Sequence, residues 1–168
     1  MGALVSRRKF MIASLATGAI LATAGFAVRL APAAPGAWVL STHEIGICDA
    51  IAEVLFPGDP FPVNGREAQV GLRVDREVAT LLPPTQLAAF RYLLRAVELG
   101  TEASRGVRFT RLSAADRLDV LDTWADPRVL PRRVSFDVLK VFLGMAYFRH
   151  PAVIETIGWR AECGGRRT

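Results

Sequence analysis

The sequence predicts an all-α fold: a small domain of about five helices that follows a distinct N-terminal segment. Three observations favour this fold. After residue 34, apolar residues recur at intervals of three and four, which is the spacing that lines one face of a helix. Prolines, glycines and N-capping residues divide the region into pieces of helix length. The apolar–polar alternation that marks strands is scarce.

The first predicted helix begins at Ser41, because Ser41 and Glu44 have the spacing of a capping box. Three prolines between residues 57 and 62 end it. The second predicted helix covers residues 70–82 and stops at Pro83-Pro84. The apolar face of the first helix is formed by Ile45, Cys48, Ile51, Ala52 and Leu55.

The third predicted helix is capped by Thr85 and ends at Gly100, and residues 104–110 are expected to form a loop. Ser113, with Asp116 three residues on, caps the fourth helix, which Asp126-Pro127 ends. We expect the inner face of the fourth helix to be formed by Leu118, Leu121 and Trp124.

The fifth predicted helix begins near Pro131 and ends at His150-Pro151. Residues 152–159 are expected to add a short helix that ends at Gly158. The fifth helix is apolar on more than one face, which indicates either a central core helix or contact with a second subunit. The apolar residues that nearly encircle it are Val138, Leu139, Val141, Phe142, Leu143 and Met145.

The N-terminal segment has the pattern of a twin-arginine export signal. Arg7, Arg8 and Lys9 are basic, Phe10 follows them, and residues 10–28 carry no charge. Arg7, Arg8 and Phe10 are the expected signal residues. We therefore predict a signal peptide over residues 1–33 and a single helical domain over residues 34–168, located in the periplasm or at the outer face of the cytoplasmic membrane.

Two small-residue sequences fit a cleavage site, Ala22-Thr23-Ala24 and Ala31-Pro32-Ala33. The alternative is a retained membrane anchor, since the uncharged run approaches the ~20 residues that span a bilayer. Its content of Ala, Gly and Thr favours a cleaved signal.

The charge balance excludes nucleic-acid binding. Residues 1–33 hold four of the 21 basic side chains and none of the 16 acidic ones, so the remaining chain carries a net charge of only +1. Binding to nucleic acid needs a concentrated basic face.

Two cysteines, Cys48 and Cys163, could form a disulfide in an oxidising compartment. The alternative is two unpaired thiols, with Cys48 acting as a small buried apolar residue. The sequence lacks Cys-x-x-Cys-His, so we expect no c-type haem attached to this chain.

No residue pattern predicts catalysis, cofactor binding or a metal site in this chain. His43-Glu44 begins like a zinc-protease motif, but Ile47 stands where the second histidine belongs. His43 is expected at the surface, and His150 beside a helix C-terminus, where the dipole favours a cation. Three aspartates of the fourth helix predict a solvated face: Asp116, Asp119 and Asp122.

The C-terminal half resembles the gluconate 2-dehydrogenase subunit 3 family. Phe109-x-x-Leu112 is followed by Arg117, Leu121 and Trp124 in the family's order and spacing. The chain departs from the pattern near its end, where Trp159 replaces the usual Tyr and Arg160-Ala161 replaces a glycine. The similarity continues through Arg133, Phe136, Lys140, Tyr147-Phe148, Pro151 and Ile157-Gly158-Trp159.

This resemblance implies a non-catalytic small subunit. Its partner would be a large flavoprotein of the glucose–methanol–choline (GMC) oxidoreductase type, which carries FAD and oxidises a sugar, sugar acid or related alcohol. A third subunit, a cytochrome c with haem c, often accepts the electrons. The small subunit often supplies the export signal. The competing hypothesis is a self-sufficient helical binding protein of the periplasm or cell surface.

If the chain is such a subunit, we expect the fifth helix and the C-terminal segment to contact the large subunit, since aromatic and arginine side chains anchor interfaces. The alternative is that these residues only close the domain's own core. The expected contact residues are Phe136, Tyr147, Ile157, Trp159 and Arg160.

Overall fold

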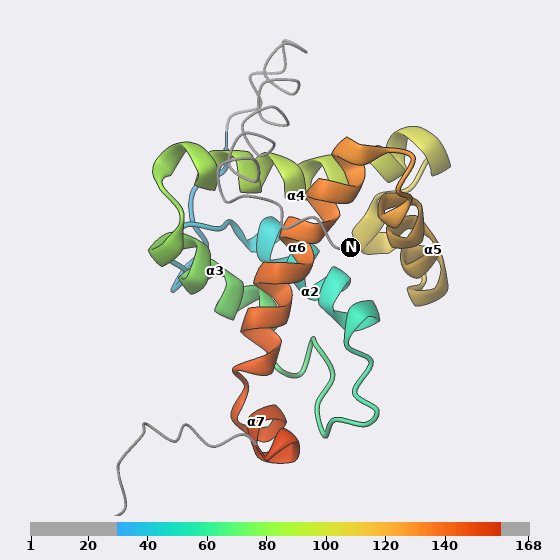
Figure 1. The fold of residues 1–168 in the computed structure, drawn as a ribbon. Coiled ribbons are helices and arrows are strands. Elements are labelled where there is room, and N and C mark those ends of the chain that lie inside the picture. The colour runs from blue at the N-terminus through green and yellow to red at the C-terminus, as the bar shows by residue number, and fades with distance from the viewer. Residues whose placement is uncertain (1–29, 159–168) are drawn as a thin grey trace, which may run out of the picture.

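The computed structural model describes residues 30–158, and this part of the chain is all-α, as predicted (Figure 1). A 3-10 turn, η1, separates α4 from α5. Among these residues, no helix combines the length and the apolar composition that a bilayer crossing requires. The elements are α2 (Thr42–Leu55), α3 (Val70–Leu81), α4 (Pro84–Arg105), η1 (Phe109–Arg111), α5 (Ala114–Ala125), α6 (Leu130–Phe148) and α7 (Pro151–Ile157).

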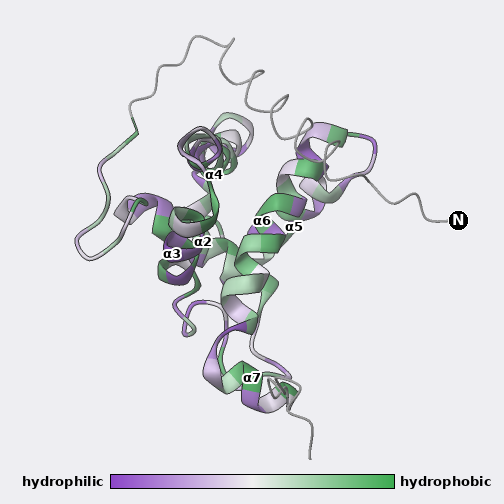
Figure 2. Ribbon diagram, turned by 60° about the vertical axis from the view of Figure 1, so that its left-hand side comes forward, coloured by the Kyte–Doolittle hydropathy of each residue, from purple (hydrophilic) through white to green (hydrophobic). Residues whose placement is uncertain are grey.

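Helix α6 runs through the middle of the domain (Figure 1) and packs against α3 and α5. Helix α2 contacts α3, α4 and α5, so α2 and α6 together hold the other helices. The short helix α7 follows the end of α6 and lies at one extremity of the domain in both ribbon views (Figures 1 and 2). Hydrophobic residues follow α6 along most of its length (Figure 2), which fits its central position.

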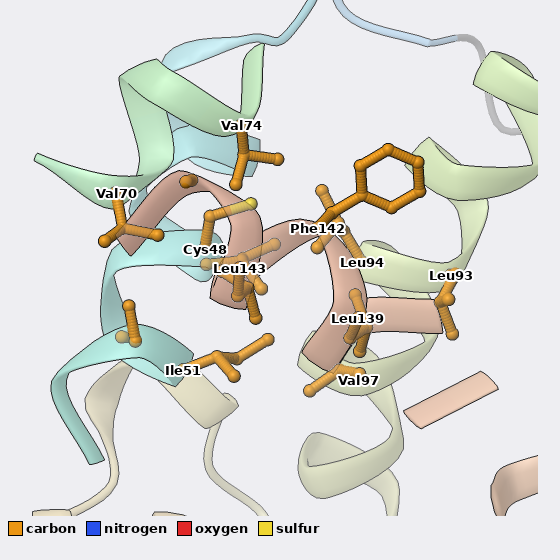
Figure 3. Close-up of a cluster of buried hydrophobic side chains, with 14 of the residues drawn as sticks. Cys48, Ile51, Val70, Val74, Leu93, Leu94, Val97, Leu139, Phe142 and Leu143 are labelled. Carbon is orange, nitrogen blue, oxygen red and sulfur yellow. The ribbon is translucent and has the colours of Figure 1, made fainter. Parts of the chain in front are cut away.

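The core forms where α2, α3, α4 and α6 meet (Figure 3). Cys48 lies here as a fully buried thiol, and burial raises its pKa, so the uncharged form is favoured. Cys163 lies outside the described residues, and the pairing of the two cysteines stays a prediction. Side chains of the core include Ile51, Val70, Val74, Leu93, Leu94, Val97, Leu139, Phe142 and Leu143.

The start of α2 confirms the predicted capping box. The backbone N–H of Glu44 donates to Ser41 Oγ at 3.4 Å, and the backbone N–H of Ser41 donates to Glu44 Oε2 at 2.8 Å. Ser113 caps α5 through its Oγ, which accepts the Asp116 N–H at 3.2 Å. Gly158 ends α7 in the left-handed conformation, with φ of 69°, where the sequence predicts an end.

The prediction for α4 is wrong at both ends. Pro83 precedes the helix without a side-chain cap, and Pro84 takes the first turn. The helix passes through Gly100 and ends at Gly106, which has φ of 71°. Gly100 is exposed and has no packing neighbour. The next residue, Thr101, is buried, so this turn of the helix remains packed against the domain.

The predicted inner face of α5 is also partly wrong. Leu121 is buried, but Leu118 is 46% exposed and Val120 faces the core in its place. Because α5 packs against both α2 and α6, its buried face is rotated from the predicted one. Trp124 is only partly buried. The three aspartates of α5 are solvated, as predicted, and Asp116 and Asp119 form ion pairs with Arg105.

Two glycines allow close contact between elements. A Cβ at Gly71 of α3 would lie 2.6 Å from the Ile45 carbonyl oxygen of α2. A Cβ at Gly65 would lie 2.3 Å from the Ala52 carbonyl oxygen. Both distances are below any real carbon–oxygen contact, so these positions require glycine for α2 to approach its neighbours.

Candidate functional site

Glu44 is the centre of a buried ion cluster between α2 and α4. Its carboxylate is fully buried and accepts hydrogen bonds from the Ser41 N–H and hydroxyl, each at 2.8 Å. Arg91 of α4 donates from Nη2 at 2.8 Å and from Nε at 3.1 Å. Arg95 Nε lies 3.4 Å from the same carboxylate. Arg91 and Arg95 are one helical turn apart, so α4 presents both to α2.

Burial alone would raise the pKa of Glu44. The hydrogen bonds from Arg91 and Ser41 oppose this effect and hold the pKa below its ordinary value. Glu44 is therefore charged at neutral pH and pairs with cations rather than acting as a proton donor.

Asp75 of α3 holds the segment that leads into α2. Its carboxylate is buried and accepts three consecutive backbone N–H groups, from Trp38 at 2.6 Å, Val39 at 2.9 Å and Leu40 at 2.7 Å. Charge-assisted hydrogen bonds of this kind are stronger than neutral ones. The segment is thereby fixed to the domain immediately before α2.

Arg91 extends this attachment toward the N-terminus, because its Nη2 also donates to the carbonyl oxygen of Ala31. The backbone N–H of Ala34 donates to the carbonyl oxygen of Leu40 at 2.8 Å. In Figure 1 the segment is drawn in blue beside α3 and α4. Residues 31–41 are therefore part of the folded domain.

Glu98 of α4 forms a second buried polar cluster. Its carboxylate accepts the Thr110 N–H at 3.0 Å and the Thr110 hydroxyl at 2.7 Å, which attaches η1 to α4. His43 Nε2 lies 3.5 Å from the same carboxylate, and the His43 side chain is half exposed, as predicted for a surface histidine.

Arg117 of α5 completes the attachment of η1. It donates from Nε to the Phe109 carbonyl at 3.3 Å, from Nη2 to the Thr110 carbonyl at 2.8 Å, and from Nη1 to Glu53 at 2.8 Å. Phe109 is fully buried in the core. Phe109 and Arg117 both belong to the pattern that resembles the family. Their contacts join α2, η1 and α5.

A hollow of about 450 Å³ lies over α2 beside these clusters. Arg66 and Arg117 line it, but both guanidinium groups already approach Glu53, at 3.5 Å and 2.8 Å. His43 and Thr110 also line it, and both face the buried carboxylate of Glu98. The residues around it are Thr42, His43, Gly46, Ala50, Arg66, Thr110 and Arg117. The hollow can accept a polar group.

The end of α6 carries an aromatic cluster that holds the loop after α2. Tyr147 stacks on Phe56 with ring centroids 4.3 Å apart and meets Phe61 edge to face. The Tyr147 hydroxyl donates to the Val63 carbonyl at 2.7 Å. Phe148 joins the cluster but remains partly exposed.

The residues expected at a partner interface therefore divide into three groups. Phe136 and Tyr147 are 6% and 1% exposed, so they pack within the domain's own core rather than at its surface. Ile157 is 50% exposed on α7. Trp159 and Arg160 lie outside the described residues, as do Arg7, Arg8 and Phe10.

His150 differs from its expected role. It occupies the N-cap position of α7 without a side-chain capping hydrogen bond, and its Nδ1 is buried without a hydrogen-bond partner among the described residues. Burial, and then the nearby charge of Arg73, lower the pKa of His150. A dipole interaction needs the protonated ring, which this environment disfavours.

Glu77 of α3 is a contrasting buried carboxylate. Only its Oε1 has a partner among the described residues, the exposed Arg149 at 3.2 Å, and Oε2 has none. Burial raises the pKa of Glu77 despite Arg149 and Arg73.

No group of three or more His, Cys, Asp or Glu side chains within residues 30–158 is placed to hold a metal ion.

The helices and their buried polar clusters form a helical scaffold. The comparison with protein families agrees with the resemblance noted in the sequence. The chain belongs to the gluconate 2-dehydrogenase subunit 3 family, whose profile matches residues 42–165. Comparisons with curated proteins and with solved structures found no significant match.

Sequence reasoning missed the ion clusters. Glu44 is predicted only as a capping residue, and Asp75, Arg91 and Glu98 are not predicted to have any role. The available signal was that these charged residues fall on otherwise apolar helix faces. Since charged side chains are rarely fully buried unless paired, such positions indicate buried ion pairs.

Proposed function

We propose that this chain is the non-catalytic small subunit of an exported flavin-dependent dehydrogenase, which oxidises a sugar, a sugar acid or a related alcohol. The observation that carries the proposal is the family membership over residues 42–165, since the family is described as a subunit of a dehydrogenase. The use of Glu44, Glu98 and Arg117 to join helices supports it, because these polar groups act in the scaffold.

In this proposal the chemistry belongs to the partners. A large GMC-type flavoprotein holds FAD and oxidises the substrate, and a cytochrome c subunit carries haem c and accepts the electrons. A flavoprotein must acquire FAD before it leaves the cytoplasm, which suits an export route for folded proteins. The small subunit stabilises the large one and supplies its export signal through Arg7 and Arg8.

The attachment of residues 31–41 supports the export role. Arg91 and Asp75 join this segment to the domain, so the proposed signal is continuous with a rigid part of the fold. A partner bound to the domain would then travel with the signal. The complex would act in the periplasm or at the outer face of the cytoplasmic membrane.

The outer side of α6 and α7 is the part of the domain that best suits a partner. Val141, Phe148 and Ile157 are large apolar side chains that the domain leaves about half exposed. Trp159 and Arg160 follow Ile157 directly in the sequence. Because Phe136 and Tyr147 serve the core, we place the contact on these exposed residues and on the segment after Gly158.

Isolation of the tagged full chain from the native periplasm and membranes tests the proposal. A flavoprotein in fixed ratio, with bound FAD and dehydrogenase activity toward sugars or polyols, is the expected result. The purified small chain alone should show no turnover with an artificial electron acceptor. Turnover by the chain alone would refute the proposal. A soluble monomer with no flavoprotein would favour the competing binding-protein hypothesis.

A further inference from the structure

The fold bears on where the proposed export signal is cut. Ala31-Pro32-Ala33 is one of two small-residue sequences that fit a cleavage site. Cleavage there would break the bond between Ala33 and Ala34. A peptidase binds its substrate as an extended strand, through main-chain N–H and C=O groups on both sides of this bond.

In the folded domain three of these main-chain groups are already occupied, although the side chains of Pro32 and Ala33 are exposed. The Ala31 carbonyl accepts a hydrogen bond from Arg91 Nη2. The Ala34 N–H donates to the Leu40 carbonyl at 2.8 Å, and the Ala34 carbonyl accepts the Ala37 N–H at 3.0 Å. The chain therefore folds back on itself immediately after Ala33 instead of extending.

The groups that hold the segment are themselves fixed. Arg91 is anchored by three further hydrogen bonds, which its Nε and Nη2 donate to the buried carboxylate of Glu44. Leu40 is fully buried, and its N–H donates to Asp75 at 2.7 Å. Opening the segment would break all of these contacts at once, so the free energy of local unfolding at Ala33 is high.

We propose that the folded domain protects the Ala33–Ala34 bond and that Arg91 is the latch that holds it, so residues 31–33 remain on the exported chain. This inference rests on the proposed export signal. Arg91 is a positioning residue that fixes Ala31. The exported chain then begins before Ala31, through cleavage at the earlier small-residue sequence or through retention of the signal.

The first experiment determines by mass spectrometry the N-terminus of the chain recovered outside the cytoplasm. A chain that retains Ala31–Ala33 is the expected result. An N-terminus at Ala34 would overturn the proposal. Failure of the chain to leave the cytoplasm would instead contradict the export function, so the two failures are distinguishable.

A second experiment does not depend on export. The full chain is purified and treated with a protease that cleaves after alanine, and the product that begins at Ala34 is quantified over time. Arg91→Gln should accelerate this cleavage by about tenfold or more, since a charged hydrogen bond to Ala31 is lost. Because Arg91 also pairs with Glu44, the urea midpoint of the variant is measured as well, and the acceleration should exceed that of cleavage at sites inside the domain. Arg105→Gln is the matched control, because Arg105 lies on the same helix but pairs with Asp116 and Asp119.

Asp75→Asn gives an independent check, because it loosens the segment at Leu40 and leaves the Glu44 cluster in place. It should also accelerate cleavage at Ala33, and circular dichroism of each variant confirms that the domain is folded. Rapid cleavage of the wild-type chain at this bond, or equal rates in wild type, Arg91→Gln and Asp75→Asn, would refute the latch.

Discussion

Replacement of Glu44 by glutamine should be among the most destabilising single changes in this domain. The variant keeps the size of the side chain but removes the buried negative charge with which Arg91 and Arg95 pair. Breaking a buried ion pair by removing one partner typically costs 3–5 kcal/mol. The two arginine side chains keep 11% and 17% of their surface exposed, so we expect about 3 kcal/mol, the lower end of that range.

Urea denaturation of the full chain at pH 7 measures this loss. With a slope of about 2 kcal/mol per molar urea, the unfolding midpoint of Glu44→Gln should fall by about 1.5 M. Glu77→Gln is the control, since Glu77 is also buried but forms its ion pair with the exposed Arg149. Its loss should stay below about 1 kcal/mol.

The pH dependence of stability provides a second readout of the same cluster. The pKa of Glu44 is lower in the folded state than its ordinary value of 4.5. Glu44 therefore contributes stability above its unfolded pKa, and this contribution is lost as the pH falls through the folded pKa. Wild type should lose stability below about pH 4.5 more steeply than Glu44→Gln. A loss under 1 kcal/mol at pH 7, with parallel pH profiles, would refute the proposed role of the cluster.

Three further outcomes are expected. Gly65→Ala should destabilise the chain by about 2 kcal/mol or more, because its Cβ would meet the Ala52 backbone. Gly100→Ala has no neighbour in contact and should stabilise the chain by up to about 1 kcal/mol in the same denaturation assay. Equal effects of the two substitutions would contradict the packing described here. Under reducing conditions the buried thiol of Cys48 should resist alkylation in the folded chain and react after denaturation, as read by mass spectrometry, and rapid native reaction would disprove its burial. Trp159→Ala should weaken assembly with the flavoprotein by about 2 kcal/mol or more and leave the melting temperature of the isolated chain unchanged; the reverse pattern would assign Trp159 to the core.

The sequence predicts those features that depend on local chemistry. The capping box at Ser41 and Glu44, the Ser113 cap and the end of α7 at Gly158 are confirmed because each depends on residues within one helical turn. The all-α class follows from the helical spacing of the apolar residues, and the packing of the domain keeps these segments helical.

Features that depend on contacts between helices could not be predicted in the same way. Helix α4 continues through Gly100 because tertiary packing outweighs the modest cost of an exposed glycine. The exposure of Leu118 depends on how α5 meets α2 and α6. The partners of Asp75 lie 35 to 37 positions away, and Arg91 lies 47 positions from Glu44, so spacing along the chain gives no indication of these contacts.

The core positions of Phe136 and Tyr147 show why the apolar character of α6 does not identify an interface. A central helix and a subunit contact produce the same sequence pattern. The stacking of Tyr147 on Phe56 and its hydrogen bond to Val63 resolve this ambiguity for Tyr147, because they connect α6 to a loop of the same domain.

The most direct test of the central claim is the location of the flavoprotein partner when Arg7 and Arg8 are both replaced by lysine. Activity and FAD are measured in the cytoplasmic and exported fractions of cells that carry the double variant or the wild-type chain. Our account predicts that the partner stays in the cytoplasm in the variant and is exported with the wild-type chain. Export of the partner at normal levels with the double variant would contradict the role of this chain as the carrier of the export signal.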